Sequence, residues 1–89
     1  MRRPRVDWMT RADDAILEFL LNDGNRPIVA NPSTVEANVE YKISHVRRRL
    51  RALEEGDLVE YYDEDRGLYR ITDLGRAYLA GELDADDLE

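Results

Sequence analysis

The sequence predicts a single α+β domain made of a helical half, a β-hairpin and a closing helix. Apolar residues in 43–53 recur at the spacing of one helix face, and aromatic and β-branched runs at 58–62 and 68–71 flank a short polar loop. The chain has 89 residues, enough for one hydrophobic core but not for two. It has no cysteine, which excludes disulfides, cysteine-based zinc sites and thiol catalysis.

The first helix is expected to begin after Thr10 and to run to about Leu21. Thr10 and Asp13 stand at the spacing of a capping box. The residues predicted to face the core are Ala12, Ala15, Ile16, Phe19 and Leu20, and those predicted to face water are Asp13, Asp14 and Glu18. Residues 22–25 should end the helix, and the apolar run at 27–30 predicts a short first strand.

A short second helix follows. Asn31 supplies an N-cap and Pro32 a first-turn proline, so the helix should extend to about Asn38. Val35 and Val39 are its expected core contacts. Asn38 is expected to adopt a left-handed conformation and to begin the turn into the next helix.

The third helix, predicted at 42–55, has one apolar face and one basic face. Its apolar stripe consists of Ile43, Val46, Leu50 and Leu53. Between Lys42 and Arg51 there are five cationic side chains and no carboxylate, although the chain as a whole has a net charge of −7. A basic run is often only a solvated face, but a tight turn after a second helix makes this pair a helix-turn-helix and favours DNA reading. Gly56 is expected to end the helix at the C′ position.

A β-hairpin and a last helix complete the domain. Residues 58–62 and 68–71 are the predicted strands, and the loop between them is acidic except for Arg66. Arg66 either contacts DNA or serves only the turn. Thr72 should cap the last helix, and Gly81 should end it. The residues of this helix predicted to return to the core are Leu74, Ala77, Tyr78 and Leu79.

The two ends of the chain carry opposite charges. Residues 1–9 form a basic arm, and residues 82–89 form an acidic tail that is expected to be disordered. Trp8, Met9 and the final helix favour a homodimer. The tail could also cover the basic helix until DNA displaces it, which is a hypothesis based on charge alone.

Two stretches resemble the third helix, wing and fourth helix of the winged helix-turn-helix transcription regulators. They are VRRRLRALEEGDLVEYY and YRITDLGRAYL. Over residues 8–81 the chain is similar to small haloarchaeal regulators of the phage-repressor-like kind, with the domain itself at 10–81. The resemblance implies a sequence-specific DNA-binding transcription regulator, with repression as the expected role and helix 42–55 in the major groove of double-stranded DNA.

A helical wheel places Arg48 near the centre of the outward face, with Arg47 and Arg49 on its flanks. By the resemblance, the expected base-reading residues are Ser44, His45 and Arg48, and the expected phosphate contacts are Lys42, Arg47, Arg49 and Arg51.

The acidic balance leaves a rival interpretation. Either the chain does not bind nucleic acid and its arginine face docks on an acidic protein partner, or it works in high salt, where charge repulsion is screened. Arginine supplies 12 of the 13 basic residues, a composition that favours a halophilic archaeon.

An enzyme is not expected. His45 is the only histidine, and no phosphate-binding loop, nucleophile elbow or metal-ligand spacing is present. No cofactor, metal or small-molecule ligand is expected. No apolar run is long enough for a membrane span and no signal peptide is recognised, so a cytoplasmic protein without membrane contact is expected.

Overall fold

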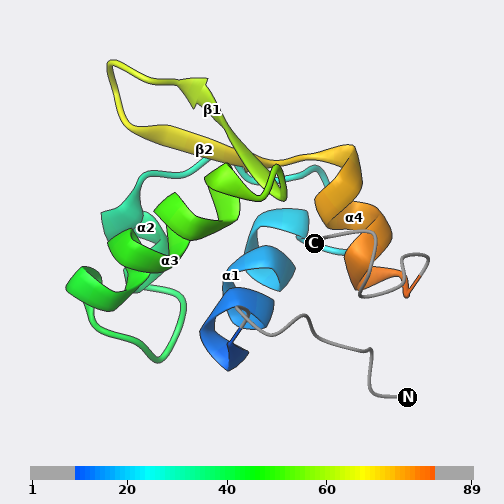
Figure 1. Cartoon of the computed structure of the whole chain (residues 1–89), viewed down its shortest axis with the longest axis horizontal. Coiled ribbons are helices and arrows are strands. Elements are labelled where there is room, and N and C mark those ends of the chain that lie inside the picture. The colour runs from blue at the N-terminus through cyan, green and yellow to red at the C-terminus, as the bar shows by residue number, and fades with distance from the viewer. Residues whose placement is uncertain (1–9, 82–89) are drawn as a thin grey trace.

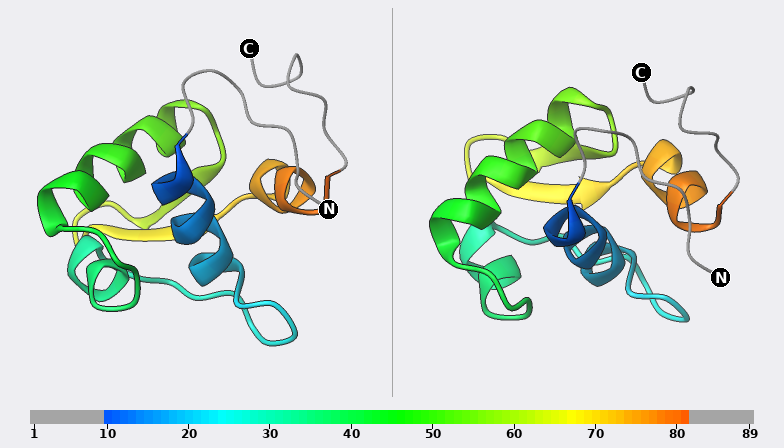
Figure 2. Two further views of the ribbon diagram at one scale, coloured as in Figure 1. Left: turned by 90° about the horizontal axis from the view of Figure 1, so that it is seen from below. Right: turned by 60° about the horizontal axis from the view of Figure 1, so that its bottom comes forward.

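The computed structural model describes residues 10–81, so the basic arm, including Trp8 and Met9, and the acidic tail lie outside the described residues. The elements in chain order are α1 (Arg11–Leu21), α2 (Pro32–Glu36), α3 (Ile43–Glu55), β1 (Val59–Asp63), β2 (Leu68–Ile71) and α4 (Asp73–Leu79). The hairpin lies along one side of the helices, and the start of α3 and the hairpin turn both point away from α4 (Figure 1). Helix α1 lies between α3 and α4 (Figure 2).

Helix α1 has the predicted bounds, and it buries the predicted core residues Ala12, Ile16 and Leu20 together with two residues that were not predicted. The Thr10 N–H donates to Asp13 Oδ2 at 2.9 Å, as expected for the Asp13 half of a capping box. Asp13 was predicted to face water, and this was wrong, because its side chain is completely buried. Leu17, absent from the predicted stripe, is also fully buried. Asn22 ends the helix in a left-handed conformation with φ 52°.

Helix α2 begins as predicted but ends two residues early, at Glu36. The Thr34 N–H donates to Asn31 Oδ1 at 2.8 Å, which confirms the N-cap. The left-handed conformation predicted for Asn38 was wrong, since the non-glycine residues with positive φ in the described chain are Asn22 and Asp57. Instead, the Asn38 side-chain amide donates to the Thr34 carbonyl at 2.8 Å and its N–H donates to the Val35 carbonyl.

Helix α3 buries three of the four residues of the predicted stripe and ends in a Schellman motif. Val46, Leu50 and Leu53 are fully buried, whereas Ile43 at the start of the helix is half-buried. Gly56 has φ −87° and is the C-cap, so its predicted C′ position was wrong, and Asp57 takes the left-handed position with φ 63°. The Leu58 N–H donates to the Leu53 carbonyl at 2.9 Å, and the Asp57 N–H donates to the Glu54 carbonyl at 3.1 Å. Two otherwise orphan carbonyls are thereby satisfied as the chain turns into the hairpin.

Strands β1 and β2 pair antiparallel with Val59 opposite Ile71 and Tyr61 opposite Tyr69. The register shifts between Tyr61 and Asp63, so the hairpin contains a bulge near its turn. The short strand predicted at 27–30 is reduced to one bridge, in which Ala30 and Tyr69 exchange two backbone hydrogen bonds of 3.1 and 2.9 Å. This bridge joins β2 to the segment between α1 and α2.

Helix α4 returns the chain to α1. The Gly75 N–H donates to Thr72 Oγ1 at 3.1 Å, which confirms the predicted cap. Tyr78 is buried, and its hydroxyl donates to Asp14 Oδ1 at 2.7 Å. Three packed helices, a hairpin and a closing helix form the expected winged helix-turn-helix arrangement, in which the hairpin is the wing.

Candidate nucleic-acid interface

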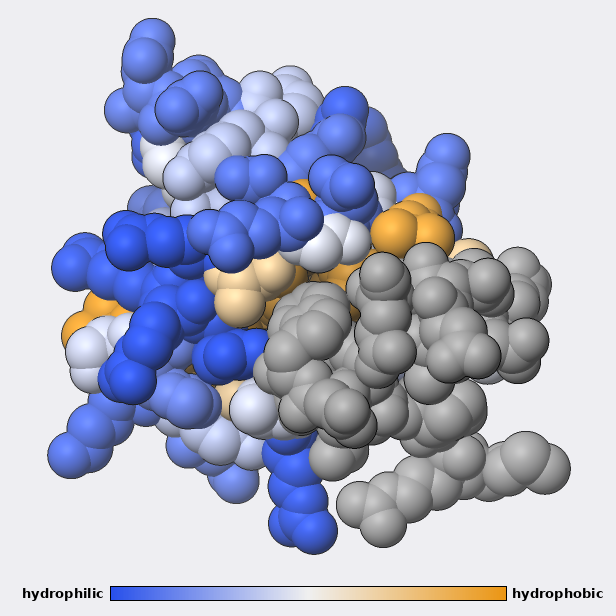
Figure 3. Space-filling view, viewed as in Figure 1, coloured by the Kyte–Doolittle hydropathy of each residue, from blue (hydrophilic) through white to orange (hydrophobic). Residues whose placement is uncertain are grey.

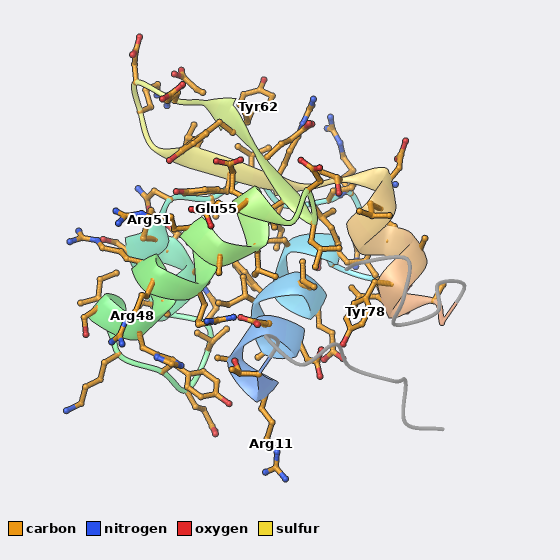
Figure 4. All side chains as sticks on the ribbon, in the orientation of Figure 1. Arg11, Arg48, Arg51, Glu55, Tyr62 and Tyr78 are labelled. Carbon is orange, nitrogen blue, oxygen red and sulfur yellow. The ribbon has the colours of Figure 1, made fainter. Side chains whose placement is uncertain are left out.

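Helix α3 presents a basic face to solvent because its apolar stripe packs in the core and its basic residues therefore lie on the outside. Arg47, Arg48 and Arg51 are exposed, as are Lys42 and Ser44 at the start of the helix. Arg48 and Arg51 project on the side opposite α4 (Figure 4). In the space-filling view the most hydrophilic surface gathers over the same side (Figure 3). The structure therefore brings these predicted residues onto one exposed surface.

The exposed arginines of α3 are not neutralised within the described part of the chain. Among residues 10–81, no carboxylate forms an ion pair with Arg47, Arg48 or Arg51. Glu54 and Glu55 follow in the last turn of α3 but do not pair with them. The three guanidinium groups are consequently available to an external anion.

Carboxylates gather on a different part of the surface. The hollow beside the wing and α4 has a volume of about 750 Å³. Its acidic lining residues are Glu54, Asp57, Glu60, Glu64 and Asp73. Arg70 and Arg76 line the same hollow, so its charge is mixed and it differs from the carboxylate-free stretch of α3 between Ile43 and Arg51.

His45 is half-buried at the start of α3 beside Tyr41. The two ring centroids are 5.6 Å apart and the rings are tilted by 37°. Tyr41 precedes the helix and packs partly against the core, so it restricts the side on which the imidazole can lie.

Arg49 differs from the other arginines of α3. Its Nε lies 2.7 Å from Asp13 Oδ1 and its Nη2 lies 2.7 Å from Asp13 Oδ2, and its side chain is only 17% exposed. The hydrogen bond to Asp13 raises the pKa of Arg49, and the Coulomb attraction adds to this, while burial opposes both. No local sequence pattern signals the role of Asp13, because its partner is 36 residues away.

The wing carries two arginines in different settings. Arg66 is exposed in the turn, where its backbone N–H donates to Asp63 Oδ1 at 3.3 Å. Arg70 forms an ion pair with Glu60 across the strands, with 2.6 Å between Nε and Oε2, and its guanidinium lies 5.7 Å from the centre of the Tyr62 ring. Arg66 therefore remains the predicted cation at the tip of the wing.

Two tyrosines pair across the strands of the wing, and neither was among the predicted site residues. The Tyr69 hydroxyl donates to the Tyr61 hydroxyl at 3.0 Å, and their ring centroids are 4.6 Å apart. Burial raises the pKa of Tyr69, and the hydrogen bond to Tyr61 raises it further, whereas the positive charge of Arg51 opposes the shift. The signal available in the sequence was that Tyr61 and Tyr69 flank the hairpin loop and can face each other across the strands.

Metal-binding groups of side chains and membrane-spanning helices are both absent from residues 10–81. Within residues 10–81, no group of three or more histidine, aspartate or glutamate side chains could hold a metal ion. No helix in the same range is long and apolar enough to cross a bilayer.

A helix-turn-helix with an exposed basic second helix and a hairpin wing defines a winged helix-turn-helix protein. The chain belongs to the winged helix-turn-helix phage repressor family, whose model matches residues 1–89. This is a family of DNA-binding regulators and not of enzymes.

Two relatives agree with this assignment. The chain is 34% identical over 87 residues to a repressor protein of Halobacterium phage phiH, covering 96% of this chain and 94% of the relative. It is also similar to the crystal structure of the PhiH1 repressor-like protein from Haloarcula marismortui, with a TM-score of 0.76 and 38% identity. That match covers 96% of this chain and 92% of the other.

Proposed function

We propose that this protein is a sequence-specific transcription repressor that places α3 in the major groove of double-stranded DNA. The observation that carries the proposal is the set of three exposed arginines on α3 without a carboxylate partner in residues 10–81. An α-helix fits the major groove, and arginine can bond bidentately to guanine or grip phosphate.

The proposed contacts divide into bases and backbone. Ser44, His45 and Arg48 are the proposed base readers, because they lie in the first half of α3, where Ser44 and Arg48 are exposed and His45 is half-buried. Lys42, Arg47 and Arg51 are proposed to hold the phosphates on either side, and Arg66 to reach the backbone from the wing.

We further propose that the protein works at high salt in the cytoplasm of a halophilic archaeon. Arginine supplies 12 of the 13 basic residues of a chain with net charge −7, and the two relatives come from Haloarcula marismortui and a Halobacterium phage. At molar salt the Debye length is about 3 Å, so the acidic remainder of the surface hardly repels DNA while close contacts from α3 persist.

Binding as a homodimer is part of the proposal. Two copies would present two α3 helices to two half-sites about 34 Å apart, one turn of DNA. Sedimentation with and without a palindromic duplex tests this, and a single protomer per duplex at saturation would contradict it.

The test of the proposed function compares Arg48→Ala with a matched control. Arg26→Ala removes the same charge from an exposed position in the segment between α1 and α2. Each protein is titrated with a mixture of short genomic duplexes at low salt and in molar potassium chloride.

Saturable, sequence-selective binding in molar salt is expected for the wild type and for Arg26→Ala, with a loss of about tenfold for Arg48→Ala, the value of one good base contact. Absence of binding to any duplex in either salt would refute groove reading. The basic face would then be pursued as a surface that docks an acidic protein.

A further inference from the structure

Asp13 is buried in a way that its sequence neighbourhood does not explain. It lies in the first turn of an amphipathic helix, where a carboxylate usually faces water. Among residues 10–81, however, Asp13 is the one charged residue that is buried, with none of its surface exposed. Burying a carboxylate costs several kcal/mol unless it is paired and hydrogen-bonded. Its environment must therefore be built to hold a charge.

Both carboxylate oxygens of Asp13 are satisfied. Oδ1 accepts from Arg49 Nε at 2.7 Å, and Oδ2 accepts from Arg49 Nη2 at 2.7 Å and from the Thr10 N–H at 2.9 Å. One carboxylate thus fixes the start of α1 and grips a side chain in the middle of α3. A planar guanidinium bound through two nitrogens cannot rotate freely about the contact, so the pair is directional.

Apolar contacts between the two helices do not have this property. The shared core of α1 and α3 includes Ile16, Leu17, Val46 and Leu50, and their packing stabilises the contact between the helices. Apolar packing nevertheless tolerates small rotations and shifts. A bidentate pair between α1 and α3 selects one rotation of α3 about its own axis. Arg49 adjoins Arg48, so the same rotation decides where Arg48 points.

Helix α1 has a second polar contact in the same turn. The Tyr78 hydroxyl of α4 donates to Asp14 Oδ1 at 2.7 Å. Consecutive carboxylates therefore tie α1 to α3 on one side and to α4 on the other, in the arrangement seen in Figure 2. Because α1 is held on both sides, the orientation of α3 is set relative to α1.

We propose that Asp13 and Arg49 are positioning residues that set the orientation of α3 toward DNA, and that Arg49 does not grip phosphate. This inference rests on the proposed function, and it reassigns one residue that the sequence analysis placed among the phosphate contacts. The remaining cations of α3 keep their proposed roles.

The two possible roles of Arg49 predict different effects of Asp13→Asn on the ratio of specific to non-specific affinity. This substitution removes a negative charge and weakens the hold on Arg49. If Arg49 grips phosphate, the variant binds every duplex more tightly. If Arg49 positions α3, non-specific binding is unchanged or tighter, while the ratio of specific to non-specific affinity falls by about tenfold, as for one misplaced base contact.

Arg49→Lys is the second variant, and it carries the test if Asp13→Asn does not fold. Lysine keeps the charge that a phosphate contact needs but cannot form the planar two-nitrogen fork. A phosphate role predicts specific affinity close to that of the wild type, whereas a positioning role predicts the same tenfold loss of the specificity ratio.

Matched controls make the same chemical changes at exposed sites. Asp23→Asn removes a carboxylate in the turn after α1, and Arg26→Lys changes an exposed arginine in the segment between α1 and α2. Both should keep the specificity ratio of the wild type within about threefold, since neither residue belongs to the proposed DNA contacts.

A measurement without DNA separates this inference from the proposed function. Amide residual dipolar couplings of α1 and α3 in the free proteins report the angle through which α3 is rotated about its own axis relative to α1. The angle should change in Asp13→Asn and Arg49→Lys, and it should stay at the wild-type value in Asp23→Asn and Arg26→Lys.

An unchanged angle in folded Asp13→Asn and Arg49→Lys would overturn the inference. So would wild-type specificity ratios in both variants. If the wild type binds no duplex, the proposed function fails, and the change of angle alone decides whether the pair positions α3.

Discussion

Gly75→Ala should destabilise the protein, although alanine is the better helix former. Gly75 is buried in α4 against the start of the hairpin. A Cβ atom at this position would collide with the Leu58 carbonyl oxygen and would lie 2.7 Å from Ile71 Cγ1. The carbonyl cannot move aside cheaply, because it accepts the Thr72 N–H at 3.1 Å at the junction of β2 and α4. The helix must therefore shift away from the hairpin.

The expected magnitude follows from two opposing terms. Overpacking a well-filled site costs about 1–3 kcal/mol, and the upper value applies here because the obstacle is backbone. Replacing glycine by alanine within a helix contributes about 1 kcal/mol in the opposite direction. The free energy of unfolding should fall by about 2 kcal/mol, which for a domain of this size lowers Tm by on the order of 10 °C.

Thermal and urea unfolding followed by far-ultraviolet circular dichroism, in molar potassium chloride, measures the effect. Arg76→Ala is the matched control, because it alters the next residue of α4 at an exposed position and should change the free energy of unfolding by less than about 0.5 kcal/mol. If Gly75→Ala were as stable as the wild type, or more stable by the helix-propensity term alone, the close approach of α4 to the hairpin would be refuted.

Three further substitutions test separate contacts. Thr72→Ala loses the hydroxyl that caps α4 through the Gly75 N–H and should lower the free energy of unfolding by about 1 kcal/mol in urea; an unchanged midpoint would contradict the cap. Asp57→Gly should raise it by about 0.5 kcal/mol, since glycine adopts the left-handed φ of 63° without a Cβ penalty, and a lower midpoint would count against this. Tyr69→Phe loses the hydrogen bond to Tyr61 and should cost about 1 kcal/mol at pH 8. Because the folded pKa of Tyr69 is raised, its contribution is present below the ordinary tyrosine value of about 10 and is lost as the pH rises above it. The wild type should thus lose more stability than Tyr69→Phe between pH 8 and pH 11, and equal losses would refute the assignment.

Most elements could be predicted because their signals are local. The caps at Asn31 and Thr72 depend on a side chain and a backbone N–H three residues later, and both hydrogen bonds are formed. The stripe of α3 depends on helical spacing alone, and its members Val46, Leu50 and Leu53 are fully buried. Such signals survive in the folded chain because few distant contacts compete with them.

The errors share a different cause. Asp13 was predicted to face water because most carboxylates in proteins are exposed. Leu17 was not predicted to be buried, because the buried side of α1 is decided by α3 and α4, which pack on either side of it. Gly56 was given the left-handed position by composition, whereas Asp57 takes it because Leu58 must turn into the core. Each outcome depends on a partner outside the local window.

The candidate site divides in the same way. The sequence by itself determined that α3 has an apolar face and an arginine face, because helical periodicity and residue type are sufficient for that. Only the tertiary structure decided that Arg49 bonds to Asp13 while Arg48 and Arg51 remain exposed. The physical reason is that burial of a charge is set by what lies opposite it, and the carboxylate opposite Arg49 comes from a helix 36 residues earlier in the chain.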